Sequence, residues 1–347
     1  MRPASINHNS WSVAAVLACL VWSAHGHAEL PDYQPAQNVA GSLTSVGSDT
    51  LRVVVQQWGD AFAKLYPDIR FDMEAEGSAT GPVALTEGRS NLAPMSREMN
   101  DAEVEAYERA FGYEPTAVRV ALDALAVYVH KDNPIRGLTL EQLDGIFSAD
   151  QACGGDAITA WGDVLLGAIA EQPIMLYGRN ALSGTHDYFQ SRVLCDGAFN
   201  DRVQEQPSSE AVVEAVGASI NAIGYSGLGY RADSVRPIAI SRGPDEEDDP
   251  YYTYLVEQWR DDPDLAKRYA YVIDGRYPLS RFLYLYVDKA PDKPLEPAIE
   301  EFVKFALSSQ GQAIVHEIGY VPLTEQMVEE ELAKLQADYE PSWWSFD

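Results

Sequence analysis

The chain has 347 residues, 46% of them hydrophobic, which is enough for two lobes or for one large α/β domain with a real core. Its formal net charge is −28 at pH 7. The overall electrostatic field of such a chain repels nucleic acid and anionic membrane surfaces, which excludes them as partners bound through that field. A small anion would also be repelled at long range. An anion site would therefore need local donors, which is possible because salt screens exposed charges beyond about 8 Å.

The N-terminus predicts a cleavable secretory signal. Arg2 gives a weak positive start, Trp11–Trp22 is a short apolar run, and Gly26-His27-Ala28 ends in small residues at a cleavage site. Removing residues 1–28 takes away one arginine and no other charge, so the mature charge is −28 − 1 = −29. The alternative is a lipoprotein anchored through Cys19, for which the preceding apolar run is very short. No later run of 18 apolar residues occurs, so we expect no membrane-spanning helix.

Two cysteines, Cys153 and Cys195, remain after the signal is removed. A lone pair in an exported chain predicts a disulfide, and the alternative is two free buried thiols. No histidine stands at ligand spacing from either cysteine, so we expect no metal site.

Strands and helices alternate along the chain. The predicted strands cover residues 43–46, 69–73, 118–130, 173–177, 222–226 and 282–287. The predicted helices cover residues 51–65, a stretch through Leu85, 138–147, 188–194, 212–220, 259–272, 297–314 and the start of the tail after Glu325. Such alternation favours an α/β fold with a parallel-rich sheet and helices on both faces. The β-rich runs at 118–130 and 282–287 are candidates for segments that pass between two lobes, and a single doubly wound domain remains open.

Three predicted strands end in small hydroxyl and glycine residues that precede a helix, at residues 47–50, 77–81 and 183–185. In open α/β sheets, ligands bind outside the carboxyl ends of strands. Hydroxyl side chains cap the helix, glycine lets the backbone approach a ligand, and free N–H groups with the helix dipole favour an anion. Arg179 would add a forked clamp. The alternative for each loop is an ordinary capped helix.

In these residues the chain resembles the periplasmic phosphate-binding proteins of the phosphate-specific ABC transporter. The strongest match runs from Gly178-Arg179 to Ser183-Gly184-Thr185. The other matching motifs are Gly47 to Leu51, Gly77-Ser78, Ser96-Arg97, Ile223-Gly224-Tyr225, Tyr277-Pro278-Leu279, Ser309 to Gln312 and Gly319 to Pro322. Their order and spacing cover most of residues 40–325.

The resemblance implies an α/β fold of two lobes, a type II clamshell, each lobe a mixed mostly parallel sheet flanked by helices. We expect residues 29–118 and about 288–347 in one lobe and about 119–287 in the other. Phosphate would lie dehydrated in the cleft, which closes by hinge motion. The resemblance implies these phosphate-binding residues: Thr50, Leu51 (through its N–H), Ser78, Arg179, Ser183, Gly184 and Thr185. We add Asp49, Ser96 and Arg97 as further candidate ligand-binding residues.

The sequence departs from the best-known family members at two positions. At Arg97 those members have a carboxylate, which accepts the proton of hydrogen phosphate and rejects sulfate. Asp49 is our hypothesis for the missing acceptor, and its alternative role is a charge at a helix N-terminus. Arg97 has the alternative of pairing with a carboxylate. The second departure is Ala181, where an aspartate that supports the arginine clamp is common.

We therefore expect a periplasmic binding protein, monomeric and without cofactor, that captures inorganic phosphate and delivers it to a membrane ABC permease. The alternatives are a receptor for sulfate or another tetrahedral oxyanion, and a surface protein of phosphate-starved cells. An enzyme such as a phosphatase is not expected, because the three histidines of the mature chain, His130, His186 and His316, stand in scattered contexts.

Overall fold

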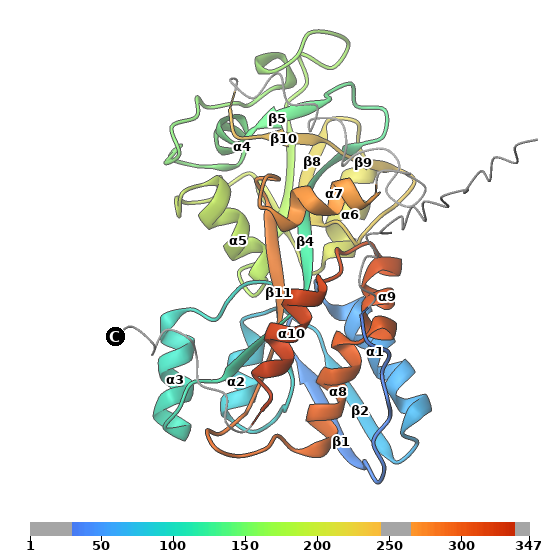
Figure 1. Ribbon diagram of the computed structural model, residues 1–347. Coiled ribbons are helices and arrows are strands. Elements are labelled where there is room, and N and C mark those ends of the chain that lie inside the picture. Colours follow the sequence, from blue (N-terminus) through green and yellow to red (C-terminus); the bar gives the residue numbers. More distant parts are fainter. Residues whose placement is uncertain (1–29, 244–264, 337–347) are drawn as a thin grey trace, which may run out of the picture.

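The computed structural model describes residues 30–243 and 265–336, which form two lobes connected by two long strands (Figure 1). The strands are β4 (Thr116–His130) and β11 (Ser280–Val287). The predicted signal peptide, the Trp343-Trp344 tail and residues 259–264 of the predicted 259–272 helix lie outside the described residues. The rest of that predicted helix is confirmed as α7.

The first lobe combines the N-terminal and C-terminal parts of the chain (Figure 1). Its elements are β1 (Gly41–Val46), α1 (Arg52–Leu65), β2 (Ile69–Glu74), α2 (Thr80–Thr86), β3 (Ala93–Met95), α3 (Asp101–Phe111), α8 (Pro297–Leu307), α9 (Ser309–Ile318) and α10 (Glu325–Ala333). The side chains that α1 buries are apolar and lie three or four positions apart, which explains the helix: Val54, Val55, Trp58 and Phe62.

The second lobe contains the middle of the chain (Figure 1). Its elements are β5 (Gly137–Thr139), α4 (Leu140–Phe147), the 3₁₀ helix Trp161–Asp163, β6 (Met175–Arg179), α5 (Gly184–Val193), β7 (Val203–Gln206), α6 (Ser209–Gly217), β8 (Ala222–Gly227), β9 (Val235–Pro237), β10 (Ala239–Ser241) and α7 (Leu265–Ile273). A disulfide joins Cys153 to Cys195 in this lobe, as predicted.

Strand β4 exchanges partners at its middle. Residues Thr116 to Ala124 pair antiparallel with β11, and residues Leu125 to Val129 pair antiparallel with β8. The main sheet has the order β3-β11-β4-β8-β6-β7, with β9 also on β4. Strands β6 and β7, β6 and β8, β1 and β2, and β5 and β10 pair in parallel. Because β4 and β11 continue from lobe to lobe, the lobe boundaries at 118/119 and near 287/288 stay predictions.

The helix predicted over 297–314 is two helices. Ser308 has an extended backbone (ψ 171°), which ends α8, and its Oγ accepts a hydrogen bond from the Gly311 N–H, which caps α9. A serine that competes with the helix for its own backbone donors is a common stop signal, and the apolar periodicity across Ser308 concealed it.

Some short or polar elements were not predicted: α3 and the strands β3, β5, β7, β9 and β10. Among its own residues α3 buries only Tyr107, so its apolar periodicity is weak. The strands have only three or four residues each. Across residues 30–243 and 265–336, no helix combines the length and apolar composition that crossing a membrane needs.

Candidate functional site

The three predicted loops converge where the lobes meet. The Gly77 N–H donates to the Gly47 carbonyl at 2.9 Å, which joins the first two loops. The Ala79 N–H donates across the lobes to the Leu182 carbonyl at 3.1 Å, which brings in the third. The loops that were expected to share a ligand are therefore in direct contact.

Gly184 lies where the third loop comes close to Ser78 and Ser96 of the first lobe. A Cβ atom on Gly184 would lie 2.4 Å from Ser78 Oγ and 2.8 Å from Ser96 Oγ, distances that side chains do not tolerate. Ser78 and Ser96 are fully buried, and the Ser96 N–H donates to Ser78 Oγ at 3.0 Å. Glycine is thus required here for the approach of the two lobes.

Hydroxyl groups from both lobes meet beside this glycine. Thr50 Oγ1 and Thr185 Oγ1 are 2.8 Å apart in a buried hydrogen bond. Ser183 is the N-cap of α5, and its Oγ accepts from the Thr185 N–H at 3.2 Å. Leu51 is the N-cap residue of α1, so its backbone lies at the positive end of that helix. Two helix N-termini therefore border one cluster of hydroxyl groups.

Arg179 ends strand β6 beside these loops, and its side chain is 0% exposed. Nη1 donates to Asp49 Oδ2 at 2.9 Å and to Ser209 Oγ at 2.7 Å, and Nη2 donates to the Pro207 carbonyl. Burial lowers the pKa of Arg179, and the Asp49 charge opposes that shift. Asp49 and Ser209 therefore hold the guanidinium. They do so in the absence of an aspartate at position 181, where this chain has Ala181.

Asp49 has partners on both carboxylate oxygens. Oδ2 accepts from Arg179 and from the Ser209 N–H at 2.8 Å, and Oδ1 lies 3.7 Å from Arg52 Nε. The Asp49 carbonyl accepts from the Tyr230 hydroxyl at 2.6 Å. The proton-acceptor hypothesis for Asp49 stays a prediction, and the observed position is that of a support for Arg179.

Arg97 lies at the edge of the same region and bridges the lobes. Its Nε donates to Asp187 Oδ2 at 2.7 Å, and its Nη1 and Nη2 form a fork on Glu103 at 2.7 and 2.9 Å. Burial opposes the charge, but the hydrogen bonds to Glu103 and Asp187 raise the pKa of Arg97. Contact between Arg97 and an anion stays a prediction that requires Arg97 to exchange one of these carboxylates.

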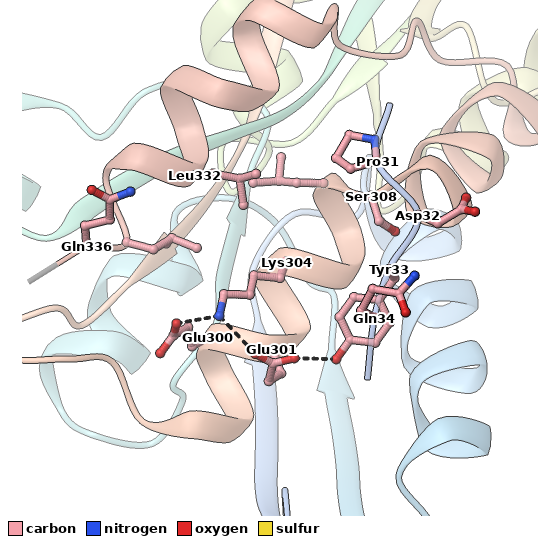
Figure 2. A pocket seen from close by; sticks show the side chains of 12 residues that line it. Pro31, Asp32, Tyr33, Gln34, Glu300, Glu301, Lys304, Ser308, Leu332 and Gln336 are labelled. Atoms are coloured by element: carbon pink, nitrogen blue, oxygen red, sulfur yellow. Dashed lines mark hydrogen bonds and ion pairs between the residues drawn. The ribbon is translucent and has the colours of Figure 1, made fainter. Parts of the chain in front are cut away.

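One cavity lies beside Arg179 and another beside residues 31–34, and we assign a second anion site to neither of them. His186 lines a cavity of about 260 Å³ together with Arg179, and its ring packs on Phe199 with 4.5 Å between centroids. The other cavity, of about 480 Å³, lies between the N-terminal segment, α8 and α10 (Figure 2). There Lys304 is already paired with Glu300 and Glu301 at 2.6 and 3.0 Å. Within the described ranges, no group of three or more His, Cys, Asp or Glu side chains is placed to hold a metal ion.

Two residues of the site were missed in the sequence. Arg281 Nη2 donates to Thr185 Oγ1 at 2.9 Å, and Arg281 is paired with Asp123 at 2.8 Å. A signal for both residues was present in the sequence, because each is a single charged residue within an apolar stretch of its strand. Asp123 is the only charge between Val120 and Val129, and such a residue predicts a buried partner of opposite charge.

Known proteins resemble this chain over most of its length. Residues 33–310 match the PBP superfamily domain. The phosphate-binding protein PstS of Pseudomonas aeruginosa PAO1 is 46% identical over 308 residues, which cover 88% of this chain and 90% of that protein. Among solved structures, a substrate-binding protein from Clostridium perfringens that is assigned to phosphate ABC transport and carries bound phosphate has a TM-score of 0.64 and 26% identity, over 82% of this chain and 100% of that one.

An ABC-type phosphate transport receptor from Vibrio cholerae has a TM-score of 0.58 and 22% identity, over 81% of this chain and 100% of that one, and it shows the shared fold. The family match and the Pseudomonas relative each span most of the chain. The chain therefore belongs to the PBP superfamily and, within it, to the family of the phosphate-binding protein PstS.

Proposed function

We propose that this protein captures inorganic phosphate between its two lobes and delivers it to an ABC permease. The observation that carries the proposal is a buried arginine, Arg179, that lies beside two helix N-termini and a cluster of buried hydroxyl groups. Donors in a water-excluded site act more strongly on an anion than donors in water. The names of the relatives supply the ligand and the transport system.

We assign the anion contacts to groups that lie on the converging loops. Thr50 and Thr185 would turn their hydroxyl protons to phosphate oxygens, and the N–H groups of Leu51, Gly184 and Thr185 would donate from the helix starts. Ser78, Ser96 and Ser183 would add further hydroxyl or backbone donors, and Arg179 would supply the charge. These donors give an oxyanion a full shell of hydrogen bonds, which it needs when it leaves water.

The mechanics that we propose is reversible closure. Bound phosphate adds contacts to both lobes at once, so it favours the arrangement in which the loops meet. Opening at the permease would remove half of those contacts and release the anion. This function needs no bond-making step, no cofactor and no second copy of the chain. We place the mature monomer in the periplasm, after removal of the signal at residues 1–28.

Sulfate is the second candidate ligand, and the Arg97 position favours it. A carboxylate at this position would reject an anion that has no proton to give, whereas Arg97 would not. Both anions are tetrahedral, so the same donors would fit either. Selectivity is therefore the property that separates the two candidates.

Titration calorimetry on the mature protein tests the proposal. The protein is partly unfolded and dialysed to remove bound anion, refolded, and injected with phosphate and then sulfate at pH 7. We expect tight phosphate binding and little heat from sulfate. Equal binding of both anions would show that the site binds tetrahedral oxyanions in general and is not specific for phosphate. No heat from either anion would overturn the proposed function.

A hydroxyl-to-methyl pair gives the matched control. Thr50→Val removes a buried hydroxyl at the loops, whereas Thr86→Val removes a hydroxyl that bonds only within α2, to the Pro82 carbonyl at 2.8 Å. Only Thr50→Val should weaken phosphate binding. Equal losses of phosphate affinity in the two variants would show that the Thr50 hydroxyl does not contact the anion.

A further inference from the structure

Arg281 and Asp123 form a buried ion pair across the two strands that connect the lobes. They are directly opposite in the β11–β4 register, and their side chains are 3% and 0% exposed. Arg281 Nε and Nη2 both donate to Asp123 Oδ2, at 3.1 and 2.8 Å. Oδ1 of Asp123 accepts from the Leu228 N–H. The guanidinium therefore has a fixed position at the junction of the lobes.

From that position Arg281 acts on a hydroxyl of the anion site. Its Nη2 donates to Thr185 Oγ1 at 2.9 Å, and Thr185 Oγ1 is bonded in turn to Thr50 Oγ1. A guanidinium can only donate, so it occupies a lone pair of the Thr185 oxygen and leaves the hydroxyl proton to be donated elsewhere. Thr185 therefore keeps its proton available for donation to Thr50, or to an anion that takes that place.

Arg281 also offsets a buried carboxylate next to the site. A Cβ atom on Gly227 would lie 3.2 Å from Thr50 Cγ2 and 3.3 Å from Asp123 Oδ2, so Asp123 is a close neighbour of the first loop. Arg179 and Arg281 together balance Asp49 and Asp123. Without Arg281 the four-residue group would carry a net negative charge before any anion arrived, and it would repel one.

Each of the two arginines keeps one buried donor that is not satisfied by the described residues. Nη1 of Arg281 and Nε of Arg179 are both buried, and in the described part of the chain neither has a hydrogen-bond partner. Burial lowers the pKa of Arg179, Asp49 opposes this, and the nearby charge of Arg281 lowers it further. Two buried cations that repel each other are stabilised when a dianion binds beside them.

We propose that Arg281 is the second arginine of the phosphate site, a positioning residue that neutralises Asp123 and holds Thr185 as a hydrogen-bond donor to the bound dianion. This inference rests on the proposed function, and it adds that phosphate is preferred as HPO₄²⁻ over H₂PO₄⁻. The reason is that Arg281 cancels the charge of Asp123, which would otherwise repel a dianion about twice as strongly as a monoanion.

The test compares phosphate affinity in Arg281→Gln, in Arg281→Gln/Asp123→Asn and in the control Arg119→Gln. Arg119 lies on β4 as Asp123 does, but it pairs with Glu330 and Glu331 on α10. Glu331 keeps Lys334 as a partner in the control. The double variant leaves neither member of this buried ion pair charged, so we expect it to fold even where the single variant does not. Thermal unfolding of each variant confirms the folded state before calorimetry.

We expect the double variant to bind phosphate about ten- to a hundredfold more weakly than the wild type, which is the range for a lost charge-assisted hydrogen bond. In the single variant Arg281→Gln the loss should be larger at pH 8 than at pH 6, because the uncompensated charge of Asp123 repels the dianion more than the monoanion. In a Thr185→Val background the same substitutions should cost much less, since their effect passes through that hydroxyl.

A folded double variant with wild-type phosphate affinity overturns the inference and leaves the proposed function standing. A loss in Arg281→Gln that does not depend on pH, together with a loss in the double variant that is fully additive with Thr185→Val, also overturns it, because a purely structural role predicts that result. Wild-type protein that binds no phosphate overturns the proposed function and the inference together.

Discussion

Arg179 of the second lobe donates a hydrogen bond from Nη1 to Asp49 Oδ2 of the first lobe at 2.9 Å, and both side chains are buried. The two residues are 130 positions apart in the chain. The Ser209 N–H donates to the same carboxylate oxygen. The arginine that is proposed to clamp the anion is thus aligned by a carboxylate that also links the two lobes.

The first prediction concerns Asp49→Asn. The substitution removes the charged acceptor of Arg179, and we expect phosphate and sulfate to bind about tenfold more weakly or worse, within the range for hydrogen bonds to charged groups. Because the support acts on the clamp and not on the ligand proton, both anions should lose affinity by similar factors. Calorimetry with both anions measures the ratio.

The same ratio decides between the two roles of Asp49. A drop in phosphate binding that leaves sulfate binding unchanged would make Asp49 the acceptor of the phosphate proton. In that case its contact with Arg179 would be secondary. Thermal unfolding of the variant is the control for loss of structure.

The sequence was sufficient for the parts of the site that are local. Arg179 and the loop at 183–185 stand within seven residues of each other, and a strand, a hydroxyl-glycine turn and a helix form one continuous pattern. The partners that hold the arginines are not local. Asp49 is 130 residues from Arg179 and Asp123 is 158 residues from Arg281, so only the folded topology brings each pair together.

The second prediction concerns Gly184→Ala. The new methyl group would overlap Ser78 Oγ and Ser96 Oγ, which lie in the opposite lobe, so the loops must separate. Separation removes the simultaneous contacts of both lobes with an anion, and we expect phosphate affinity to fall at least tenfold, which corresponds to about 1.4 kcal/mol of binding free energy. The loss of thermal stability should be smaller, because Gly184 starts α5, where alanine is tolerated.

Gly243→Ala is the matched control, because a Cβ atom there meets nothing within 4 Å among residues 30–243 and 265–336. Its phosphate affinity should equal that of the wild type. Wild-type affinity in Gly184→Ala would mean that the lobes need not approach at this point for binding.

The fold could be predicted where burial imposes a clear period. Helix α1 and strands β4 and β11 follow from their apolar patterns. Helix α3 was missed because its pattern is polar, although Asn100 and Glu103 form a capping box, which is a signal that does not depend on burial. The break at Ser308 is a second example. The apolar periodicity continues across Ser308, but the capping serine ends α8 and begins α9 there.

The third prediction concerns the disulfide. Cys153 and Cys195 are 42 residues apart, and the chain-entropy model gives about 4 kcal/mol of stabilisation at most for such a loop. The double variant Cys153→Ser/Cys195→Ser should therefore unfold at a lower temperature. Its phosphate affinity at 25 °C should stay within a factor of about three, because neither cysteine lies at the converging loops. A large loss of affinity without a loss of stability would contradict this separation.

The fourth prediction concerns the bridge of Arg97. Its guanidinium connects Glu103 of the first lobe to Asp187 of the second, and the three side chains are 13%, 16% and 34% exposed. We expect Arg97→Gln to weaken phosphate binding only a few-fold, as for a partly exposed ion pair, and mainly through faster release. Stopped-flow release of phosphate measures this rate.

Glu210→Gln is the control for this bridge. Glu210 also pairs across the lobes, with Arg52 at 3.2 Å, but both side chains are exposed. The rate of phosphate release from Glu210→Gln should equal that of the wild type. A loss of several hundredfold in Arg97→Gln would instead support direct contact between Arg97 and the anion.

The last prediction is the pH dependence that Asp187 contributes. Burial alone would raise the pKa of Asp187, but hydrogen bonds from His186 and Arg97 outweigh burial and lower it below the ordinary value. A carboxylate with a lowered folded-state pKa contributes stability that is fully present above its unfolded pKa, about 3.9, and that is lost as the pH falls through the folded-state value. The wild type should therefore unfold at a higher temperature than Asp187→Asn by a constant margin between pH 7 and pH 5, and the margin should shrink below about pH 4. A margin that disappears between pH 7 and pH 5 would show that a group other than this carboxylate controls the bridge.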